Sequence, residues 1–326
     1  MNESPALTTS SRLASVDALR GVAVAAMILV NSPGDWGQVW WPLDHSAWHG
    51  CTPTDLVFPL FLFLVGVSLA LGSGGRRDRA RGPLPLKPGL IRAARLVGLG
   101  VALHAVAWLS LGTPAFRPMG VLQRIGLCSA LATVLLLGLT MAAPLRGRRG
   151  VLPAVLLVLL AAWAALLSLG GTLAPMINVA ARVDTAVLGR HAWQYDAATG
   201  LAQDPEGLLS TLGALATCWL GVIAGERLRR RSTRTGETGR ALLLMAGGLL
   251  AAGWLASLWM PWNKALWTPS FVLWSGGWAT ALLALAHLAI DQNGAPAWGR
   301  RFGINAITAY AGSWLLTCAL EASGAG

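Results

Sequence analysis

The chain has 326 residues, of which 55% are hydrophobic and only 12% are charged. Soluble globular proteins carry about 25% charged residues, so this deficit excludes an ordinary soluble domain. The formal net charge is nevertheless +11, and the positions of the basic residues decide what that charge means.

Apolar runs of about 20 residues between charged loops predict membrane-spanning helices. The first, at 17–31, is followed by "NSPGDW" rather than by a small-residue cleavage site, so we interpret it as an uncleaved helix. The remaining helices are expected at 55–73, 90–111, 119–142, 151–171, 207–225, 240–260, 270–290 and 303–321. The predicted fold is an all-α polytopic integral membrane bundle of about nine transmembrane helices, with residues 1–326 forming a single domain.

The basic residues favour one side of this bundle. If the N-terminus is cytoplasmic, 20 of the 25 lysines and arginines fall in segments on that side and 5 on the other. Lysine and arginine are retained on the cytoplasmic side of membrane proteins, so the distribution predicts a cytoplasmic N-terminus. The positive charge is then a topology signal with an attraction for anionic lipids, and it requires no nucleic-acid partner.

Metal and nucleotide motifs do not stand out. The four cysteines are far apart, with no C-x-x-C spacing, and the chain has neither a P-loop nor a dinucleotide-binding glycine motif. We therefore expect no metal site.

Polar residues instead gather at the predicted extracytoplasmic ends of the helices, where they can converge on one cavity. They are Asn31, Asp55, Gln123, Arg124, Asp204, Glu206, Asn263 and Lys264. The alternative is that such residues only cap helices and reach the membrane surface. The segment "DPEG" at 204–207 is typical of a helix start, so there we expect capping and leave a second role open. The first outer loop, "HSAWHGCTPTD", adds His45 and His49 beside Asp55.

Six segments in order resemble one enzyme family: "RLASVDALRG", "HSAWHGCTPTDLVFPLFLFLVG", "GVLQRIG", "DPEGLLSTL", "NKALWTPSF" and "FGINAITAY". Together they are similar to the heparan-alpha-glucosaminide N-acetyltransferases and their bacterial relatives among the transmembrane acyltransferases. The resemblance implies that acetyl-CoA on the cytoplasmic side donates an acetyl group to the amino group of a glucosamine-type acceptor on the other side. It also implies that the chain is a single acyltransferase domain in a bacterial inner membrane, surrounded by lipid, and it leaves a homodimer open.

The resemblance also assigns residues. The family pattern H-x-x-W-x-G selects His45, with Trp48 and Gly50, and leaves His49 as a bystander. The family asparagine corresponds to Asn31, a candidate oxyanion donor. Either Asp44 or Asp55 could orient the imidazole, and Asp55 is the better candidate because it is expected at the start of the second helix. Histidine suits either general-base or nucleophilic catalysis, and both routes stay open. Expected donor-binding residues are Arg20, Gln123, Arg124 and Asn305, and expected acceptor-binding residues are Trp48, Asp204, Glu206, Asn263, Lys264 and Trp267.

Other functions remain open at this stage. An O-acyltransferase of a cell-surface glycan, a transporter or flippase of sugar-type substrates, and a noncatalytic binding subunit would each use polar helix ends. The resemblance leads us to expect one or two further helices after 303–321, and the loop between Asn31 and His45 is longer and richer in tryptophan than the family pattern.

Overall fold

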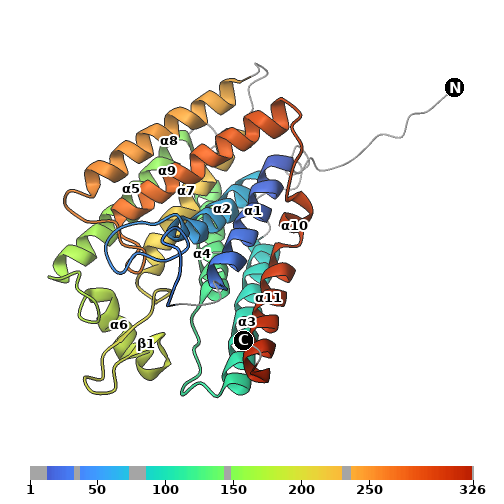
Figure 1. The fold of residues 1–326 in the computed structure, drawn as a ribbon. Helices are drawn as coiled ribbons and strands as arrows, with labels where there is room; N and C mark the ends of the chain where they lie inside the picture. The colour runs from blue at the N-terminus through green and yellow to red at the C-terminus, as the bar shows by residue number, and fades with distance from the viewer. Residues whose placement is uncertain (1–12, 33–36, 73–85, 143–147, 230–235, 325–326) are drawn as a thin grey trace.

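The computed structural model describes residues 13–32, 37–72, 86–142, 148–229 and 236–324. Several of the basic stretches that predict the orientation, within 73–85, 143–147 and 230–235, lie outside these residues, as does Arg12. The two ends of the described chain lie at opposite ends of a helical bundle (Figure 1).

Every predicted helix has a counterpart in the bundle. The long helices are α1 (Ala14–Asn31), α2 (Val57–Gly72), α3 (Leu86–Leu111), α4 (Val121–Ala142), α5 (Arg148–Leu169), α7 (Thr211–Arg229), α8 (Glu237–Ala256), α9 (Pro269–Ala286) and α11 (Ala306–Ser323). The shorter elements are a 3₁₀ turn (Thr54–Leu56), α6 (Val179–Val187), a second 3₁₀ turn (Gly189–His191), the antiparallel strands β1 (Gln194–Tyr195) and β2 (Ala202–Gln203), a π-helical end to α9 (His287–Gln292), and α10 (Arg300–Ile304). The predicted all-α membrane fold is confirmed.

Within the described residues, seven helices are long and apolar enough to cross a membrane, and they imply contact with lipid. They are α1, Thr54–Gly72, α3, the two segments Val121–Leu139 and Gly150–Leu169, α8 and Pro269–Gln292. The helices α7 and α11, which the sequence also predicts as spans, are not among the seven. The count of nine spans therefore stays a prediction.

The centre of the bundle is the crossing of α2 and α7. Almost every side chain of α7 is buried, so this helix packs against protein and needs little apolarity of its own. Gly66 of α2 lies against the carbonyl of Cys218, and Gly221 of α7 lies against the carbonyl of Phe63. A Cβ atom at either glycine would overlap the facing backbone, so the close approach of the two helices depends on both residues.

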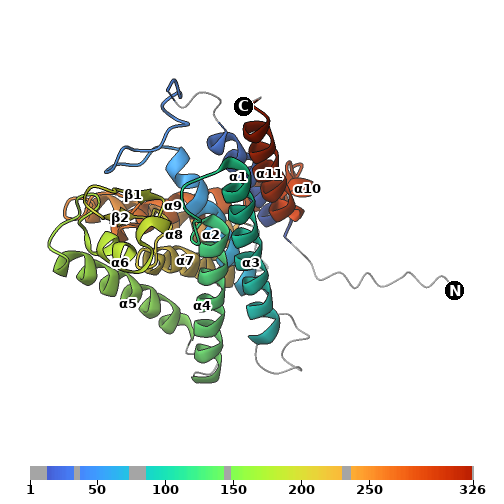
Figure 2. The ribbon, with the colours of Figure 1, turned by 90° about the horizontal axis from the view of Figure 1, so that it is seen from below.

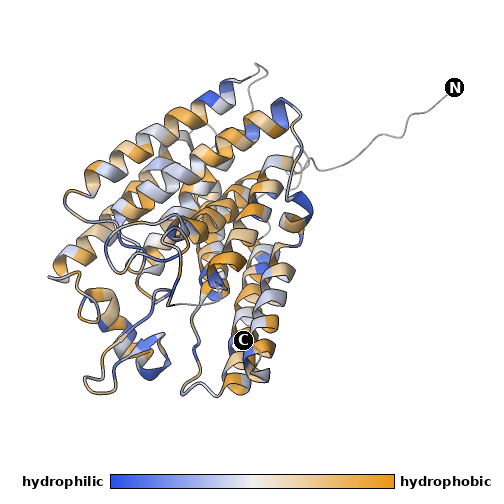
Figure 3. Ribbon diagram, viewed as in Figure 1, coloured by the Kyte–Doolittle hydropathy of each residue, from blue (hydrophilic) through white to orange (hydrophobic). Residues whose placement is uncertain are grey.

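The outer helices are α3, α5 and α8, whose spanning segments are only 17%, 28% and 22% buried. Their exposed side chains are largely apolar, as expected for a surface in contact with lipid tails. Figure 3 shows hydrophilic residues mainly at helix ends and in loops. In both ribbon views α3 runs beside α4 (Figures 1 and 2).

Three loops meet at one end of the bundle, which we call the His45 end. They are the described part of the α1–α2 connection, which carries His45, the long α5–α7 connection, and the α8–α9 connection. The backbone N–H of Gly50 donates to the carbonyl of Trp262 at 2.8 Å, and the indole N–H of Trp48 donates to the carbonyl of Leu173 at 3.0 Å. Both bonds fix the α1–α2 loop to its two neighbours.

The largest difference from the sequence prediction lies before α7. This helix begins at Thr211 rather than near 207, so Asp204 is not its N-cap and that interpretation is wrong. The Asp204 carboxylate instead accepts the N–H of Glu206 at 2.9 Å, in a turn of its own closed by Gly207. The same connection contains α6 and the β1–β2 hairpin, which are too short to give a periodic signal.

Candidate active site

The loop that carries His45 contains a glycine in a conformation that other residues rarely adopt. Gly50 has a φ of 122°, a conformation that side chains with a Cβ rarely adopt. The buried amide of Asn263 donates to the carbonyl of Trp48 at 2.8 Å and accepts the N–H of Leu266 at 2.8 Å. The tryptophan and glycine of the H-x-x-W-x-G pattern therefore anchor the loop that presents His45.

His45 is paired with Asp55. The distance from Nδ1 of His45 to Oδ1 of Asp55 is 2.7 Å. The other carboxylate oxygen accepts the N–H groups of Ser46 and Thr52 at 3.2 and 3.0 Å, and the Asp55 side chain is only 1% exposed. Because a carboxylate accepts hydrogen bonds, this pairing assigns the ring proton to Nδ1 and leaves the lone pair on Nε2. The His45 side chain is 41% exposed, so that lone pair is open to a substrate.

The third member of this group is Lys264, from the α8–α9 connection. Its Nζ lies 3.1 Å from Nδ1 and 3.2 Å from Nε2 of His45, and 3.7 Å from Oδ1 of Asp55. Burial lowers the pKa of Lys264 below its ordinary value, although the charges of Asp55 and Glu206 act in the opposite direction. We call His45, Asp55 and Lys264 the His45 cluster.

A second charged group lies in the same end of the bundle. The guanidinium of Arg117 donates to both oxygens of Asp204 at 2.9 and 2.6 Å and to Glu206 at 2.6 Å, and it lies 4.8 Å from the ring centre of Trp193. Burial alone would lower the pKa of Arg117, but the carboxylates of Glu206 and Asp204 raise it. Burial alone would raise the pKa of Glu206, but the charges of Arg117, Arg124 and Lys264 lower it. The charge of Lys264 therefore connects this group with the His45 cluster.

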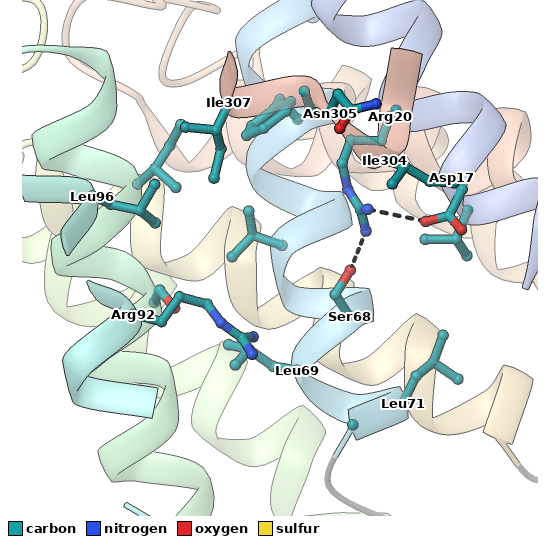
Figure 4. A pocket seen from close by; sticks show the side chains of 18 of the residues that line it. Asp17, Arg20, Ser68, Leu69, Leu71, Arg92, Leu96, Ile304, Asn305 and Ile307 are labelled. Atoms are coloured by element: carbon teal, nitrogen blue, oxygen red, sulfur yellow. Dashed lines mark hydrogen bonds and ion pairs between the residues drawn. The ribbon is translucent and has the colours of Figure 1, made fainter. Parts of the chain in front are cut away.

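A cavity of about 750 Å³ lies between α1, α2, α3, α4 and the α10–α11 region. Arg20 donates to Asp17 at 3.0 Å and to Ser68 at 2.7 Å at its wall, as Figure 4 shows. Arg92 of α3 and Asn305 also line it (Figure 4). We call this space the Arg20 cavity. It is lined by the N-terminal part of α1 and by the end of α2 at Gly72, away from the His45 end.

Along α2 the cavity reaches Phe61, six residues from Asp55. At 1.5 Å per residue, this is about 9 Å along the helix axis. The same helix therefore borders the Arg20 cavity and carries the partner of His45 just before its first turn.

Comparison of the sequence with known proteins identifies its family. The family model described as "Heparan-alpha-glucosaminide N-acetyltransferase, catalytic" matches residues 12–178, just over half of the chain. The chain belongs to this family. The matched region includes His45, Asp55, Arg20 and Arg92, whereas Lys264 and Asn305 lie beyond it.

Two curated relatives carry the same name. The heparan-alpha-glucosaminide N-acetyltransferase of Mus musculus is 28% identical over 369 aligned positions, which cover 95% of this chain and 54% of the relative. That of Homo sapiens is 29% identical over 361 positions, which cover 92% of this chain and 52% of the relative. The chain thus spans about half the length of the curated relatives it matches.

The structure brings together many of the residues that the family resemblance selects. His45, Asp55 and Lys264 are in direct contact, Trp48 and Asn263 support them from behind, and Arg20 and Asn305 share the cavity. His49 lies 3.4 Å from the amide of Asn263, and its ring packs edge-on against the ring of Trp48, with the ring centres 6.0 Å apart. Among the described residues no carboxylate lies beside His49, and its predicted bystander role stays a prediction.

Other expected site residues lie elsewhere. The side chain of Gln123 is buried beside His104, and Arg124 is fully buried, where it donates to the carbonyl of Gly207 at 2.8 Å. Neither is among the described residues that line the Arg20 cavity. The fully buried indole of Trp267 packs 5.3 Å from the guanidinium of Arg124, so it offers no surface to a sugar in this conformation.

Asn31 is the last residue of α1 and is exposed. No hydrogen bond joins it to His45 in the part of the chain that the structure describes. The oxyanion role expected for Asn31 therefore stays a prediction.

Sequence reasoning missed two arginines. In the charge distribution, Arg117 is only one of the five basic residues on the predicted extracytoplasmic side. Arg92 is only one of the 20 basic residues on the predicted cytoplasmic side. The scarcity of charge around Arg117 was itself a usable signal, since an arginine that becomes buried needs an acidic partner. No comparable signal separates Arg92 from its basic neighbours.

Proposed function

We propose that the chain is a transmembrane acetyltransferase that moves an acetyl group from acetyl-CoA to an amino sugar of the glucosamine type. The Arg20 cavity receives the donor from the cytoplasmic side, and the acceptor binds at the extracytoplasmic His45 end. The observation that carries the proposal is the pairing of the exposed His45 with the buried Asp55, just before the first turn of the helix that also borders a cavity containing Arg20 and Arg92. Family membership and the charge distribution in the sequence support the sidedness and the donor.

The donor fits the charge of the cavity. The phosphates of acetyl-CoA are strongly anionic, and Arg20 and Arg92 supply positive charge near the end of the bundle where α1 begins. The pantetheine arm is thin enough to pass between helices and bring the thioester toward the first turn of α2. Acetyl-CoA itself is too polar to cross the bilayer.

The acceptor chemistry is assigned to His45. Nε2 removes a proton from the acceptor amine as its nitrogen attacks the thioester carbon, while Asp55 fixes the ring and stabilises the imidazolium. The carbon–sulfur bond breaks, and the CoA thiolate takes up the proton. Glu206, whose side chain is 11% exposed, and Trp48 form the proposed acceptor side, while the fully buried Asp204 holds Arg117 in place behind Glu206.

The experiment measures acceptor-dependent release of CoA from acetyl-CoA by purified protein, with glucosamine as the acceptor. Wild-type protein should release one CoA per N-acetylated sugar, and mass spectrometry of the product distinguishes an amide from an ester. Binding of acetyl-CoA without any acceptor-dependent release of CoA, in protein that is folded and monodisperse, would overturn the proposal.

A further inference from the structure

Lys264 presents a primary amine at the position where the proposed reaction needs one. Its Nζ is almost equidistant from the two ring nitrogens of His45, at 3.1 and 3.2 Å. A donor in line with the lone pair of one ring nitrogen would lie much further from the other. The amine therefore lies beside the ring and is not fixed in a directed hydrogen bond to it.

The surroundings favour a reactive form of this amine. The Lys264 side chain is 19% exposed, and burial lowers its pKa despite the opposing charges of Asp55 and Glu206. A neutral amine is a nucleophile, whereas an ammonium ion is not. Nε2 of His45 is within reach of the proton that such an amine must lose.

We infer that Lys264 is itself an acetyl acceptor: when acetyl-CoA is bound and no amino sugar is present, the acetyl group passes to Nζ of Lys264. This inference rests on the proposed function, because it uses the same donor and the same base. A bond forms between Nζ and the acetyl carbonyl carbon, and the bond from that carbon to the CoA sulfur breaks. The proton of Nζ moves to His45 and then to the CoA thiolate.

The modification would close the site. Acetylation removes the positive charge that faces Asp55 and Glu206, and it leaves an acetamide where the proposed acceptor binds. We therefore expect turnover to fall as Lys264 becomes acetylated. An amino sugar in the site would protect the lysine, because the two amines compete for the same acetyl group.

The chain offers an internal control, because its sequence contains only two lysines, Lys264 and Lys87. Lys87 lies in the first turn of α3, is exposed, and has no histidine beside it in the sequence. Purified full-length protein is incubated with acetyl-CoA, and peptide mass spectrometry follows acetylation at both sites. We expect acetylation of Lys264 to exceed that of Lys87, to be suppressed by saturating glucosamine, and to be about 100-fold slower in His45→Ala, as for loss of a general base.

A second measurement uses Lys264→Arg, which keeps a positive charge but is not expected to accept acetyl. Each protein is preincubated with acetyl-CoA, and its turnover is then divided by its own turnover without preincubation. This ratio should fall for the wild type and stay at one for the variant. If the variant proves inactive, the mass spectrometry still decides the inference.

The outcomes separate this inference from the proposed function. Acetylation of glucosamine when it is supplied, with no acetylation of Lys264 when it is left out, would overturn the inference and leave the function standing. Equal acetylation of Lys87 and Lys264, unaffected by His45→Ala, would reveal spontaneous chemistry and would also overturn it. No transfer to either amine would overturn both. Transfer to Lys264 that depends on His45, without transfer to glucosamine, would support the inference and show that the acceptor class is wrong.

Discussion

The two ends of the bundle organise charge in opposite ways. At the His45 end, positive and negative side chains neutralise one another: Lys264 lies against Asp55, and Arg117 binds two carboxylates. In the Arg20 cavity, Arg20 is paired with Asp17, but the exposed Arg92 adds positive charge. A neutral, tightly bonded end suits proton transfer at fixed geometry, whereas a basic cavity suits an anionic ligand that enters and leaves.

The largest effect on this division between the two ends is expected from removal of the His45 side chain. His45→Ala should lower acetyl transfer by about 10²–10⁴-fold, the range for loss of a general base. The loss should appear in kcat more than in the affinity for acetyl-CoA, because the proposed donor site is the Arg20 cavity at the other end. His49→Ala is the matched control, because it removes a neighbouring loop histidine that has no carboxylate partner in the described part of the chain, and it should retain most of the activity.

Arg117 tests whether the neutral network also stabilises the fold. Arg117→Ala leaves Asp204 and Glu206 buried without their partner, and breaking a buried pair in this way costs about 3 kcal/mol or more. The thermal unfolding midpoint in detergent should fall clearly. Arg190→Ala is the control, because Arg190 lies on the connection that carries Asp204 and Glu206 and has no carboxylate partner among the described residues. Equal midpoints for the two variants would show that the Arg117 network does not stabilise this end.

Asp184 gives the His45 end a characteristic pH dependence. Burial and the nearby charge of Asp204 raise the pKa of Asp184 to about 6, despite hydrogen bonds from the N–H groups of Leu208 and Asp204. The folded-state pKa lies above the unfolded value, so the folded protein binds the extra proton and this group stabilises it at low pH. That stabilisation is lost as the pH rises through about 6.

The comparison with Asp184→Asn isolates this effect from other carboxylates. From pH 5 to pH 7, the stability of the wild type should fall relative to the variant by about 1 kcal/mol, as the raised pKa requires. Thermal midpoints of both proteins across this range measure it. A constant difference between them would show that Asp184 titrates normally.

Arg92 tests the role of positive charge in the Arg20 cavity, and its removal should have the smallest effect of these variants. Its guanidinium is exposed, so its attraction for a phosphate is screened and worth about 0.5 kcal/mol. Arg92→Ala should therefore raise the KM for acetyl-CoA about two- to threefold, leave kcat and the KM for glucosamine unchanged, and lose its effect at high salt. Arg240→Ala, a basic residue of α8 that does not line the cavity, is the control. A change in the KM for glucosamine alone would place Arg92 on the acceptor side.

The same contrast explains what the sequence could predict. Apolar runs located all nine long helices of the described residues, because each helix is one continuous segment of the chain. His45 and Asp55 were accessible because they are 10 residues apart in one motif. The contact of His45 with Lys264 joins residues 219 positions apart, and no local pattern specifies it.

Burial of side chains was the main reason why the structure differs from the site predicted from the sequence. Arg124 and Trp267 have residue types typical of binding sites, and the sequence places them near helix ends. Each instead covers the other inside the bundle, with 0% exposure. Polar or aromatic character alone does not reveal whether a side chain faces a cavity or a neighbouring helix.

The most direct test of the account places the two substrates on opposite sides of a membrane. The protein is reconstituted into sealed vesicles with glucosamine trapped inside, and acetyl-CoA is added outside. Molecules with the Arg20 cavity outward should produce N-acetylated sugar inside and CoA outside, and His45→Ala vesicles should produce neither. When acetyl-CoA and glucosamine are both outside intact vesicles, no product should form. Product formation from substrates on the same side, with none across the membrane, would contradict the division of the reaction between the two ends.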